Sequence, residues 1–489
     1  MPENKSGNNR LQFIALAIIC CVAVYFIQDA IFRDLWFDEA LTIINFMQLP
    51  NPLAIYRNYV IPNNQIVYTI LLKGWDCLYP QSMSVELFWR LFSVVTGLSV
   101  LTLMLMLWQK KCGLTAIFPV ATAFAASIPF MIYATGLRGY MLSMVWIVLA
   151  MYCAGSWTFR PNWRNASGYF IFSLLAVGTI PSNLLASAGI AIFLFPYFGF
   201  KKVFSAKFIY LALTPLAAIA LFYLPILKQT LKVINLGEGV PSSELALKMT
   251  YAGFVIPMLP VLIPAILGWF VFLSRKSKRK FLWLAIILLI PIPVIITRNP
   301  APFPRVFLCL WPLWLMLTGL GLFHFMAYLK SHFKISLKNL RIISLLLAVA
   351  AFGWGIAQRQ FNAELSSKLA GGNGLDDYFY PYYMQPDYQP YNLMKKIYAE
   401  ADGRPADLYF SFNAAPPAII FYGVLLGFRQ DGLLYDPPPP RKKLEDIPDG
   451  TLVILSSQEN PDGIKQRFHL KNLQPLFKQG YHEVFKAEK

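Results

Sequence analysis

The sequence predicts an α-helical polytopic membrane protein with about eleven transmembrane helices and a small C-terminal extracytoplasmic α/β domain. Of its 489 residues, 57% are hydrophobic and only 14% are charged, against about a quarter charged in soluble domains. Apolar runs long enough to cross a hydrocarbon core about 30 Å thick recur from Leu11 to Ala357. After about residue 358, strand-like and helix-like patterns alternate instead. This combination excludes an ordinary soluble enzyme.

The predicted spans follow one another with short connections. The N-terminal apolar stretch follows Lys5 and Arg10, and it is too long for a signal peptide and lacks a clear cleavage site. Two of the spans are short enough to be tilted or re-entrant. The predicted spans cover residues 11–32, 86–108, 113–133, 139–157, 167–180, 183–199, 206–226, 252–273, 281–297, 305–328 and 341–357.

The 43 basic residues outnumber the 25 acidic ones and give a net charge of +18. Most of the basic residues lie in short loops between spans, where they hold cytoplasmic loops on the inner leaflet, so the charge indicates topology and not nucleic-acid binding. With the N-terminus in the cytoplasm, the inside loops carry the basic clusters and an odd number of spans places the tail outside. The clusters are Lys110/Lys111, Arg160/Arg164, Lys201/Lys202/Lys207, the 275–280 loop and Lys330/Lys334/Lys338/Arg341.

Two long segments fall on the extracytoplasmic side, and they define the predicted domains. Residues 1–357 form the membrane domain, with a juxtamembrane loop at 33–85 whose aromatic residues favour helices in the interface. Residues 358–489 form the α/β domain. Its expected strands are Ala406–Asn413 and Thr451–Ser456, and its expected helices are 389–401, 415–426 and 464–478.

Two further motifs interrupt the tail. The tyrosine-rich stretch at 376–383 fits a linker packed on the membrane surface, and stacking on sugar rings is the alternative. The polyproline stretch Pro437–Pro440 is expected to be stiff and extended.

Metal and nucleotide motifs are missing from the sequence. The six cysteines form neither a disulfide framework nor a CxxC site. No pair among the four histidines has metal-ligand spacing. The absence of a GxGxxG or Walker pattern disfavours a nucleotide substrate.

Acidic residues are confined to a few places. The chain has no Asp or Glu from Leu87 to Gly237 or from Leu245 to Ala363, whereas four acids fall between Asp29 and Glu39. Charged groups at membrane depth are costly and usually face a polar cavity, so Asp38-Glu39 is a candidate catalytic site. Helix capping by these acids is the alternative. Adjacent helical residues do not share a face, so one acid is expected to face the cavity while the other orients a basic or backbone group.

Three arginines at the outer ends of spans complement the acids. They are Arg138, in a Leu-Arg-Gly-Tyr140 motif, and Arg298 and Arg305. The planar fork of arginine matches phosphate oxygens, so these residues are candidate ligands of a lipid phosphate. Snorkelling to the interface is the alternative for each one alone.

The motifs around these residues resemble the GT-C membrane glycosyltransferases. The resemblance rests on Trp-Phe-Asp38-Glu39-Ala after span one, on Asn63-Asn64-Gln-Ile-Val-Tyr68 in the loop, and on Phe-Trp-Arg90-Leu-Phe-Ser at span two. Within the family, the chain is most similar to the protein O-mannosyltransferase-like branch that includes the bacterial aminoarabinose transferases. The Arg138–Tyr140 and Pro304-Arg305 segments also recur in that branch.

The resemblance implies an inverting transfer of a sugar from a polyprenyl-phosphate-linked donor to an envelope glycan, lipid or protein acceptor outside the cytoplasm. It implies a bacterial inner-membrane location, with Asp38 as the catalytic base and Glu39 as its neighbour. The implied substrate-binding residues are Arg138, Tyr140, Arg298, Arg305, Asn63, Asn64, Tyr68 and Arg90.

The chain departs from the aminoarabinose transferases at three places. It has Leu41 where they have Arg, Pro62-Asn63-Asn64 where they have Glu-Lys-Pro, and Arg138-Gly139-Tyr140 near span four where they have a second Asp. Lipid A is therefore not supported as the acceptor. No cofactor is required by this chemistry, although a divalent cation is compatible with it.

Two other classes of protein remain as alternatives. A polyprenyl-lipid or solute carrier without catalytic activity is expected to show matched halves with polar groups near the midplane, and no internal repeat is found. An enzyme resembling the O-antigen ligases has its large outer loop late in the chain, whereas here the long loop follows span one.

Overall fold

A computed structural model describes the chain in two compact units. Among the described residues, the first unit takes in 5–31 and 52–364 and is called the membrane unit. The second, called the C-terminal unit, takes in 32–51, 365–369 and the described part of the tail. The structure describes residues 5–61, 64–198, 206–234, 242–275, 286–369, 388–401, 407–411, 414, 416–428, 433–435, 444, 446–457, 459–480 and 482–489.

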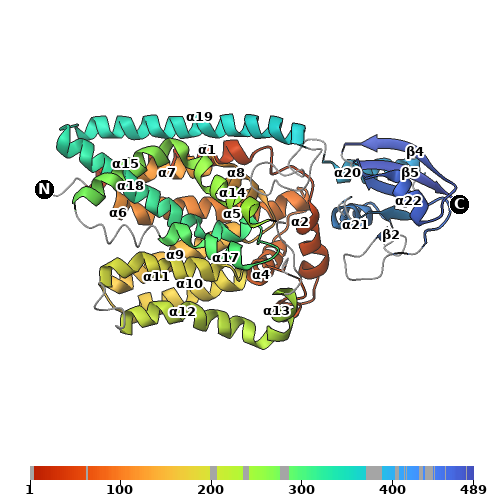
Figure 1. The fold of residues 1–489 in the computed structure, drawn as a ribbon, viewed down its shortest axis with the longest axis horizontal. Coiled ribbons are helices and arrows are strands. Elements are labelled where there is room, and N and C mark those ends of the chain that lie inside the picture. The colour runs from red at the N-terminus through yellow and green to blue at the C-terminus, as the bar shows by residue number, and fades with distance from the viewer. Residues whose placement is uncertain are drawn as a thin grey trace. The chain divides into compact units, whose positions relative to one another are not determined.

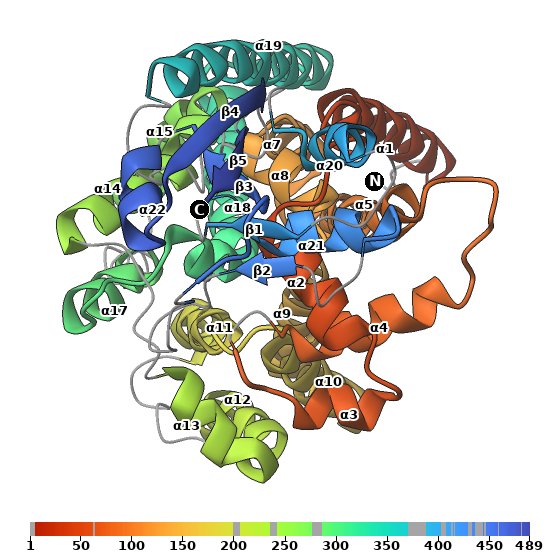
Figure 2. The ribbon, with the colours of Figure 1, turned by 90° about the vertical axis from the view of Figure 1, so that its right-hand side faces the viewer.

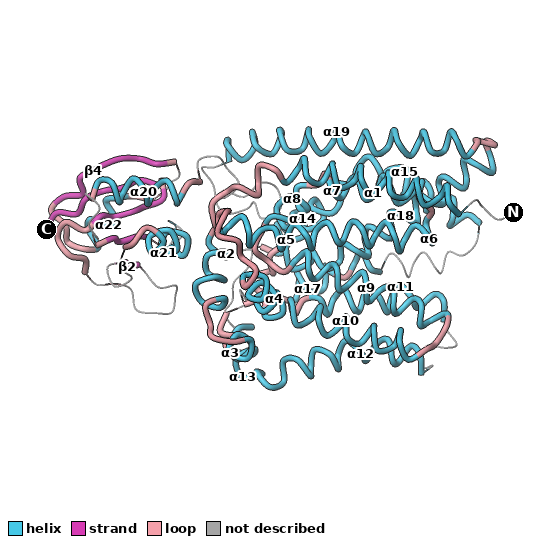
Figure 3. The backbone as a smooth tube through the Cα atoms, turned by 180° about the vertical axis from the view of Figure 1, so that it is seen from behind, coloured by secondary structure: helices cyan, strands magenta, loops and turns pink. Residues whose placement is uncertain are grey.

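The membrane unit is a bundle of helices, many of which run alongside one another (Figures 1 and 3). Its helices are α1 (Lys5–Ile27), α3 (Pro52–Arg57), α4 (Ile66–Asp76), α5 (Val85–Leu103), η2 (Met104–Trp108), α6 (Gln109–Cys112), α7 (Leu114–Ala125), α8 (Ile128–Thr135), α9 (Tyr140–Phe159), α10 (Trp163–Thr179), α11 (Asn183–Phe198), α12 (Ala206–Tyr223), η4 (Leu224–Ile226), α13 (Leu227–Ile234), α14 (Ser243–Val255), η5 (Ile256–Met258), α15 (Leu259–Arg275), α17 (Pro291–Thr297), η6 (Pro304–Leu310), α18 (Trp311–His332) and α19 (Leu337–Leu369).

The chain is a multi-pass membrane protein with fewer full-length spans than the sequence predicts. Within the described residues, seven helices are long and apolar enough to cross a membrane, or eight if the pair α7 and α8, bent by 65°, counts as one span. The other three predicted spans correspond to α10, to α11 and to the helix Ile286–Thr297. α10 has 17 residues, which at 1.5 Å each reach about 26 Å, less than a hydrocarbon core of about 30 Å.

Small residues allow close helix packing in the membrane unit. A Cβ atom added at Gly268 of α15 would lie 1.9 Å from the Gly321 carbonyl oxygen of α18, so these two backbones approach too closely for any side chain. Such small-residue contacts are how helices associate in lipid, where burial of apolar surface gives no driving force. The unit also contains an ion pair between Arg359 of α19 and Asp29.

The C-terminal unit combines helices with a sheet (Figure 2). The sheet is mixed and has five strands. The strand order is β2-β1-β3-β5-β4, with β1 parallel to β2 and β3, and β5 antiparallel to β3 and β4. Its elements are α2 (Phe37–Thr42), η1 (Ile43–Met47), α20 (Pro390–Glu400), β1 (Leu408–Phe410), α21 (Pro416–Leu425), β2 (Leu433–Tyr435), β3 (Leu452–Ser456), α22 (Pro461–Arg467), β4 (Asn472–Gln479) and β5 (His482–Glu488).

The predicted mixture of helices and strands in the tail is confirmed, but one predicted helix is wrong. Residues 464–478 end α22 at Arg467 and then form most of β4. β4 pairs with β5 and is an edge strand, with an irregularity between Pro475 and Phe477. Proline is tolerated in a sheet only at such edges and bulges, and Pro475 lies at one. The apolar spacing of 464–478 resembles that of a helix, although most of the segment after Arg467 forms a strand.

Two expected helices and two expected strands of the tail are present. The helices expected at 389–401 and 415–426 match α20 and α21, and the two expected strands contain β1 and β3. The tyrosine-rich stretch at 376–383 and Pro437–Pro440 lie outside the described residues. The domain boundary at 357/358 stays a prediction, whereas the structure groups residues 32–51 with the C-terminal unit.

Candidate functional site

The acid pair lies in the first turn of α2. Trp36 precedes the helix in an extended conformation, with φ −93° and ψ 175°. The Glu39 carboxylate accepts a hydrogen bond from the Trp36 N–H at 3.2 Å, which satisfies one of the amide groups left open at a helix start. Asp38 is partly exposed whereas Glu39 is fully buried. The two neighbouring acids are therefore in different environments, and the environment of Asp38 is the more accessible.

A buried ion pair holds Glu39. Arg33 donates from Nη2 to one Glu39 oxygen at 2.9 Å and from Nη1 to the other at 3.0 Å. The Arg33 side chain is 8% exposed, so both charges are largely withdrawn from water and a two-pronged contact compensates for the lost hydration. Glu39 thus holds one basic and one backbone group, as the sequence analysis expected of one member of the pair. Arg33 was missed, because a spacing of six residues does not put two side chains on one face of a helix.

In the membrane unit, a tight contact joins two of the motifs singled out in the sequence. The Gly139 N–H donates to Gln65 Oε1, and a Cβ atom at Gly139 would lie 2.8 Å from the Cβ of Tyr68 and 2.6 Å from Thr179 Cγ2. Only glycine fits between these groups. The Asn64–Tyr68 motif at the start of α4 and the Arg138–Tyr140 motif before α9 are therefore neighbours. Gln65 was not among the predicted site residues.

The Phe88–Ser93 motif on α5 contacts the Asn64–Tyr68 motif of α4. Tyr68 is fully buried, and its hydroxyl shares a hydrogen bond of 2.8 Å with Ser93 Oγ. Arg90 lies one helical turn before Ser93 and is 1% exposed. Its Nη1 donates to the Ile31 carbonyl oxygen at 3.2 Å. Arg90 and Tyr68 thus tie the end of the first span and α4 to α5.

Asn64 has the contacts of a loop-fastening residue. Its Nδ2 donates to the Ile55 and Asn58 carbonyl oxygens at 3.0 and 3.1 Å, and it is buried. These contacts fix the turn that leads into α4. Asn63 lies outside the described residues.

Arg138 is the most buried of the three predicted phosphate ligands. It is 6% exposed, and its guanidinium lies 5.9 Å from the centre of the Tyr140 ring. Tyr140 in turn packs edge-on against Tyr133, with ring centres 4.7 Å apart. A cation buried beside an aromatic ring is partly desolvated, and that strengthens its interaction with an anion.

Arg298 and Arg305 flank a different turn of the membrane unit. Arg298 is exposed at the end of α17, and Arg305 is half-buried in η6, 4.5 Å from the centre of the Phe303 ring. Four residues after Arg305, Cys309 Sγ lies 3.4 Å from the Ser182 carbonyl oxygen. Ser182 belongs to the turn after Thr179, the residue that touches Gly139. The α10–α11 turn therefore links η6 to the Arg138 motif.

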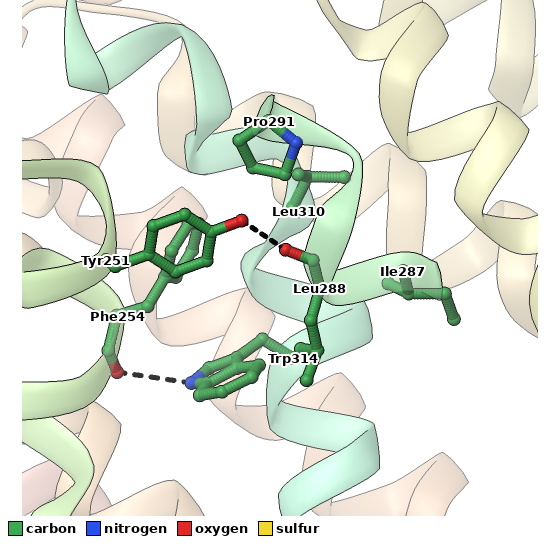
Figure 4. Close-up of a pocket in the computed structure, with 7 residues that line it drawn as sticks. All are labelled: Tyr251, Phe254, Ile287, Leu288, Pro291, Leu310 and Trp314. Carbon is green, nitrogen blue, oxygen red and sulfur yellow. Dashed lines mark hydrogen bonds between the residues drawn. The ribbon is translucent and has the colours of Figure 1, made fainter. Parts of the chain in front are cut away.

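An apolar pocket lies between α14, the helix Ile286–Thr297, η6 and α18 (Figure 4). The polar groups of two lining residues are satisfied by hydrogen bonds to backbone carbonyl oxygens. Tyr251 donates to Leu288 at 2.5 Å, and Trp314 Nε1 donates to Phe254 at 3.2 Å. The pocket is lined by Tyr251, Phe254, Ile287, Leu288, Pro291, Leu310 and Trp314.

The comparisons with known proteins establish the fold. No protein-family model and no curated protein matches the sequence. Among solved structures, ArnT from Cupriavidus metallidurans in the apo state matches with a TM-score of 0.54 and 12% identity, over 99% of this chain and 98% of ArnT. The chain has a GT-C fold.

The expected resemblance is thereby confirmed at the level of architecture. An oligosaccharyltransferase from Archaeoglobus fulgidus is also similar, with a TM-score of 0.46 and 12% identity, over 86% of this chain and 62% of that protein. On this GT-C fold, the described candidate residues form one group in the C-terminal unit, around Asp38, and one in the membrane unit, around Arg138. The roles given to them stay predictions.

The described residues contain no cluster of three or more His, Cys, Asp or Glu side chains that could hold a metal ion. The chemistry that the two groups offer is instead a carboxylate for accepting a proton and guanidinium groups for binding an anion. The need for a divalent cation is a separate question, which chelation tests directly.

Proposed function

We propose that this chain is a GT-C glycosyltransferase that moves a sugar, with inversion, from a polyprenyl-phosphate-linked donor to an acceptor on the extracytoplasmic side of the membrane. The observation that carries the proposal is the match to ArnT over almost the whole length of both chains. ArnT is an aminoarabinose transferase, which is the branch that the motifs around Asp38 resemble.

The membrane unit would bind the donor. Arg138 supplies a nearly buried guanidinium, and charge-assisted contacts to phosphate are strongest where water is excluded. Arg305 lies in η6, whose last residue, Leu310, lines the apolar pocket. Pro291 of α17 also lines this pocket, and Arg298 follows the same helix. The elements that carry Arg298 and Arg305 thus also offer an apolar wall suited to an isoprenoid chain.

Asp38 would be the general base. In the proposed step, the acceptor oxygen attacks the anomeric carbon, its proton passes to the Asp38 carboxylate, and the bond from the anomeric carbon to the phosphate oxygen breaks. The polyprenyl phosphate leaves with the electron pair, and the arginines stabilise its charge. Phosphate is a fair leaving group, so an ordinary carboxylate suffices as base. We propose no requirement for a divalent cation.

The first experiment identifies the donor and then measures transfer. Lipid-linked sugars that accumulate in a deletion strain, and the envelope glycan that is lost, are identified by mass spectrometry. Single-turnover transfer from the purified donor is then followed in nanodiscs, with and without EDTA. We expect Asp38→Asn to lower the transfer rate by about 10² to 10⁴ with donor binding retained.

The matched control is Asp462→Asn, which removes an exposed acid of α22 and should leave transfer unchanged. A near-wild-type rate in folded Asp38→Asn contradicts its assignment as the base. Movement of the intact donor across a liposome membrane, without release of polyprenyl phosphate, would instead establish the alternative, a carrier.

A further inference from the structure

The segment that carries Asp38 is held by residues that lie 353 to 387 positions later in the sequence. The helix α2 packs on α21, and both belong to the C-terminal unit. The segment enters this unit at residue 32 and leaves it at residue 51. The segment with Asp38 and Glu39 therefore folds as part of the C-terminal unit.

Two tyrosine hydroxyls hold the backbone of Leu35 from both sides. The Leu35 N–H donates to Tyr422 Oη at 2.9 Å, and Tyr388 Oη donates to the Leu35 carbonyl oxygen at 3.1 Å. All three residues are almost completely buried. A buried peptide group whose N–H and C=O are both bonded to side chains has little freedom to rotate, because any rotation breaks a bond that water cannot replace.

A third contact holds Asp34, the residue that precedes Leu35. The Tyr391 N–H donates to Asp34 Oδ2 at 2.8 Å, and the Tyr391 ring packs edge-on against Tyr422, with centres 5.5 Å apart. α20 and α21 therefore act together on the segment, α20 through Tyr391 and α21 through Tyr422. The hydroxyl of Tyr391 takes no part in the contact with Asp34, because the donor is its backbone.

The fastening leads directly to the acids. Leu35 adjoins Trp36, whose N–H is bonded to the buried carboxylate of Glu39. Glu39 is in turn bonded to Arg33. The start of α2 is thus held at Leu35 by the two tyrosines and at Glu39 by the ion pair, and Asp38 lies between these two points.

We infer that Tyr388 and Tyr422 are positioning residues, through which the C-terminal unit sets the orientation of the Asp38 carboxylate. This inference rests on the proposed function. The tail is then part of the catalytic apparatus, because without its two hydroxyls the base keeps its chemistry but loses its fixed geometry. A displacement of about 1 Å at a reacting group lowers rates by about 10²-fold.

The test removes the hydroxyls and keeps the rings. Tyr388→Phe, Tyr422→Phe and the double variant are prepared as full chains in nanodiscs. We expect kcat to fall about tenfold in each single variant and about a hundredfold in the double one, with the KM for the donor within about twofold of wild type. Hydrogen exchange of the backbone amides at 33–42 should become faster in the same order.

The matched control is Tyr398→Phe. Tyr398 lies on α20, is 37% exposed and packs on Phe428, so loss of its hydroxyl should alter neither kcat nor exchange at 33–42. This control separates a general effect of Tyr→Phe changes in the C-terminal unit from an effect on the acid segment.

Two results overturn the inference. One is an unchanged exchange rate at 33–42 in the double variant, which would mean that the hydroxyls do not order the segment. The other is faster exchange with unchanged kcat, which would mean that order in the segment does not matter to the base. If the wild-type chain transfers no sugar at all, the proposed function fails, and the exchange measurement by itself decides whether Tyr388 and Tyr422 order the segment.

Discussion

The two groups of candidate residues are held in place by different physics. Around Asp38, the main tie is a pair of opposite charges only six residues apart, Arg33 and Glu39. Around Arg138, the ties include a neutral hydrogen bond and close packing, as in the contact of Gly139 with Gln65 and Tyr68. The stretch from Leu87 to Gly237, which contains Arg138, has no acidic residue at all.

This difference suggests which group acts in catalysis and which binds the donor. The group in the C-terminal unit contains a counter-charge of its own, because Arg33 pairs with Glu39, so Glu39 is positioned without an external ion. The group in the membrane unit carries arginines, whose planar forks match the oxygens of a phosphate. Changes in the first group should therefore act mainly on stability and on kcat, and changes in the second on donor binding.

The largest effect is expected from breaking the buried ion pair. Glu39→Ala leaves Arg33 buried without its carboxylate, and breaking a buried pair in this way costs about 3–5 kcal/mol of unfolding free energy. The loss should appear in the C-terminal unit, as a lower denaturant midpoint followed by hydrogen exchange of β3 and β5.

A double variant without either charge supplies the control for Glu39→Ala. Arg33→Met/Glu39→Leu removes both charges and should recover a large part of the lost stability, since apolar residues of similar volume often replace a buried pair at little cost. If Glu39→Ala is as stable as wild type, the pair does not hold the segment, and the contrast between the two groups is lost.

The next largest effect is expected from acid. Burial lowers the pKa of His482 from 6.5 to about 4, and its Nε2 lies 3.2 Å from the Ala414 carbonyl oxygen. Between these two pH values the unfolded chain binds a proton at His482 and the folded chain does not, so stability falls as the pH falls through this window. The full loss, complete below about pH 4, is about 3 kcal/mol, at about 1.4 kcal/mol per pKa unit.

His482→Leu isolates this contribution. Since leucine does not titrate, the variant should lose less stability than the wild-type chain between pH 6.5 and pH 4, as measured by denaturant midpoints of the C-terminal unit. Parallel curves for the two proteins would show that His482 does not titrate in this way. Carboxylates of the same unit titrate in both proteins and cancel in the comparison.

In the membrane unit, the corresponding change acts on the donor. Arg138→Ala and Arg305→Ala should each weaken donor binding about tenfold or more, because hydrogen bonds to charged groups are worth about 1.5–3 kcal/mol. Lysine should restore binding poorly, since it lacks the planar fork. Donor affinity is measured by titration in nanodiscs, with Arg160→Ala, an exposed loop arginine, as the control.

Unchanged affinity in both alanine variants would refute the phosphate assignment. If only Arg138→Ala has an effect, the deeply buried arginine carries the binding and Arg305 serves η6. If only Arg305→Ala has an effect, the cluster around Arg138 is structural.

Hydropathy predicted the helical segments well but not their lengths. Each of the eleven predicted spans overlaps a helix, because burial in lipid demands long apolar runs and little else. The short helices α10 and α11 were counted as spans because hydropathy averaged along the sequence shows how apolar a run is. It does not show where a capping residue sets the boundary of the helix. Asn162, for example, caps the start of α10 through its side chain.

Contacts between distant segments could not be predicted. The link from Leu35 to Tyr388 and Tyr422 has no periodic signature, and the apolar spacing of β4 was interpreted as a helix because single-sequence periodicity cannot show which strand will pair with it. Arg33 was available in the sequence, as the one basic residue among the acids between Asp29 and Glu39. A search for opposite charges near the pair, without regard to helical spacing, would have found it.

The smallest effect is expected from a single methyl group in the membrane unit. Gly139→Ala places a Cβ atom 2.8 Å from the Tyr68 Cβ and 2.6 Å from Thr179 Cγ2. The first of these atoms is fixed to the backbone of α4 and cannot rotate away, so the motif before α9 has to shift. Such overpacking costs about 1–3 kcal/mol.

Because the shift displaces Arg138, the donor affinity of Gly139→Ala should fall together with its thermal stability. Gly74→Ala is the matched control, since Gly74 lies on the same helix as Tyr68 and a Cβ there meets nothing within 4 Å. Replacing glycine by alanine inside a helix normally stabilises by about 0.5–1 kcal/mol, so Gly74→Ala should be at least as stable as wild type. Equal midpoints for Gly139→Ala and Gly74→Ala would show that close packing at Gly139 does not hold the membrane group, and that its arginine is placed by other contacts.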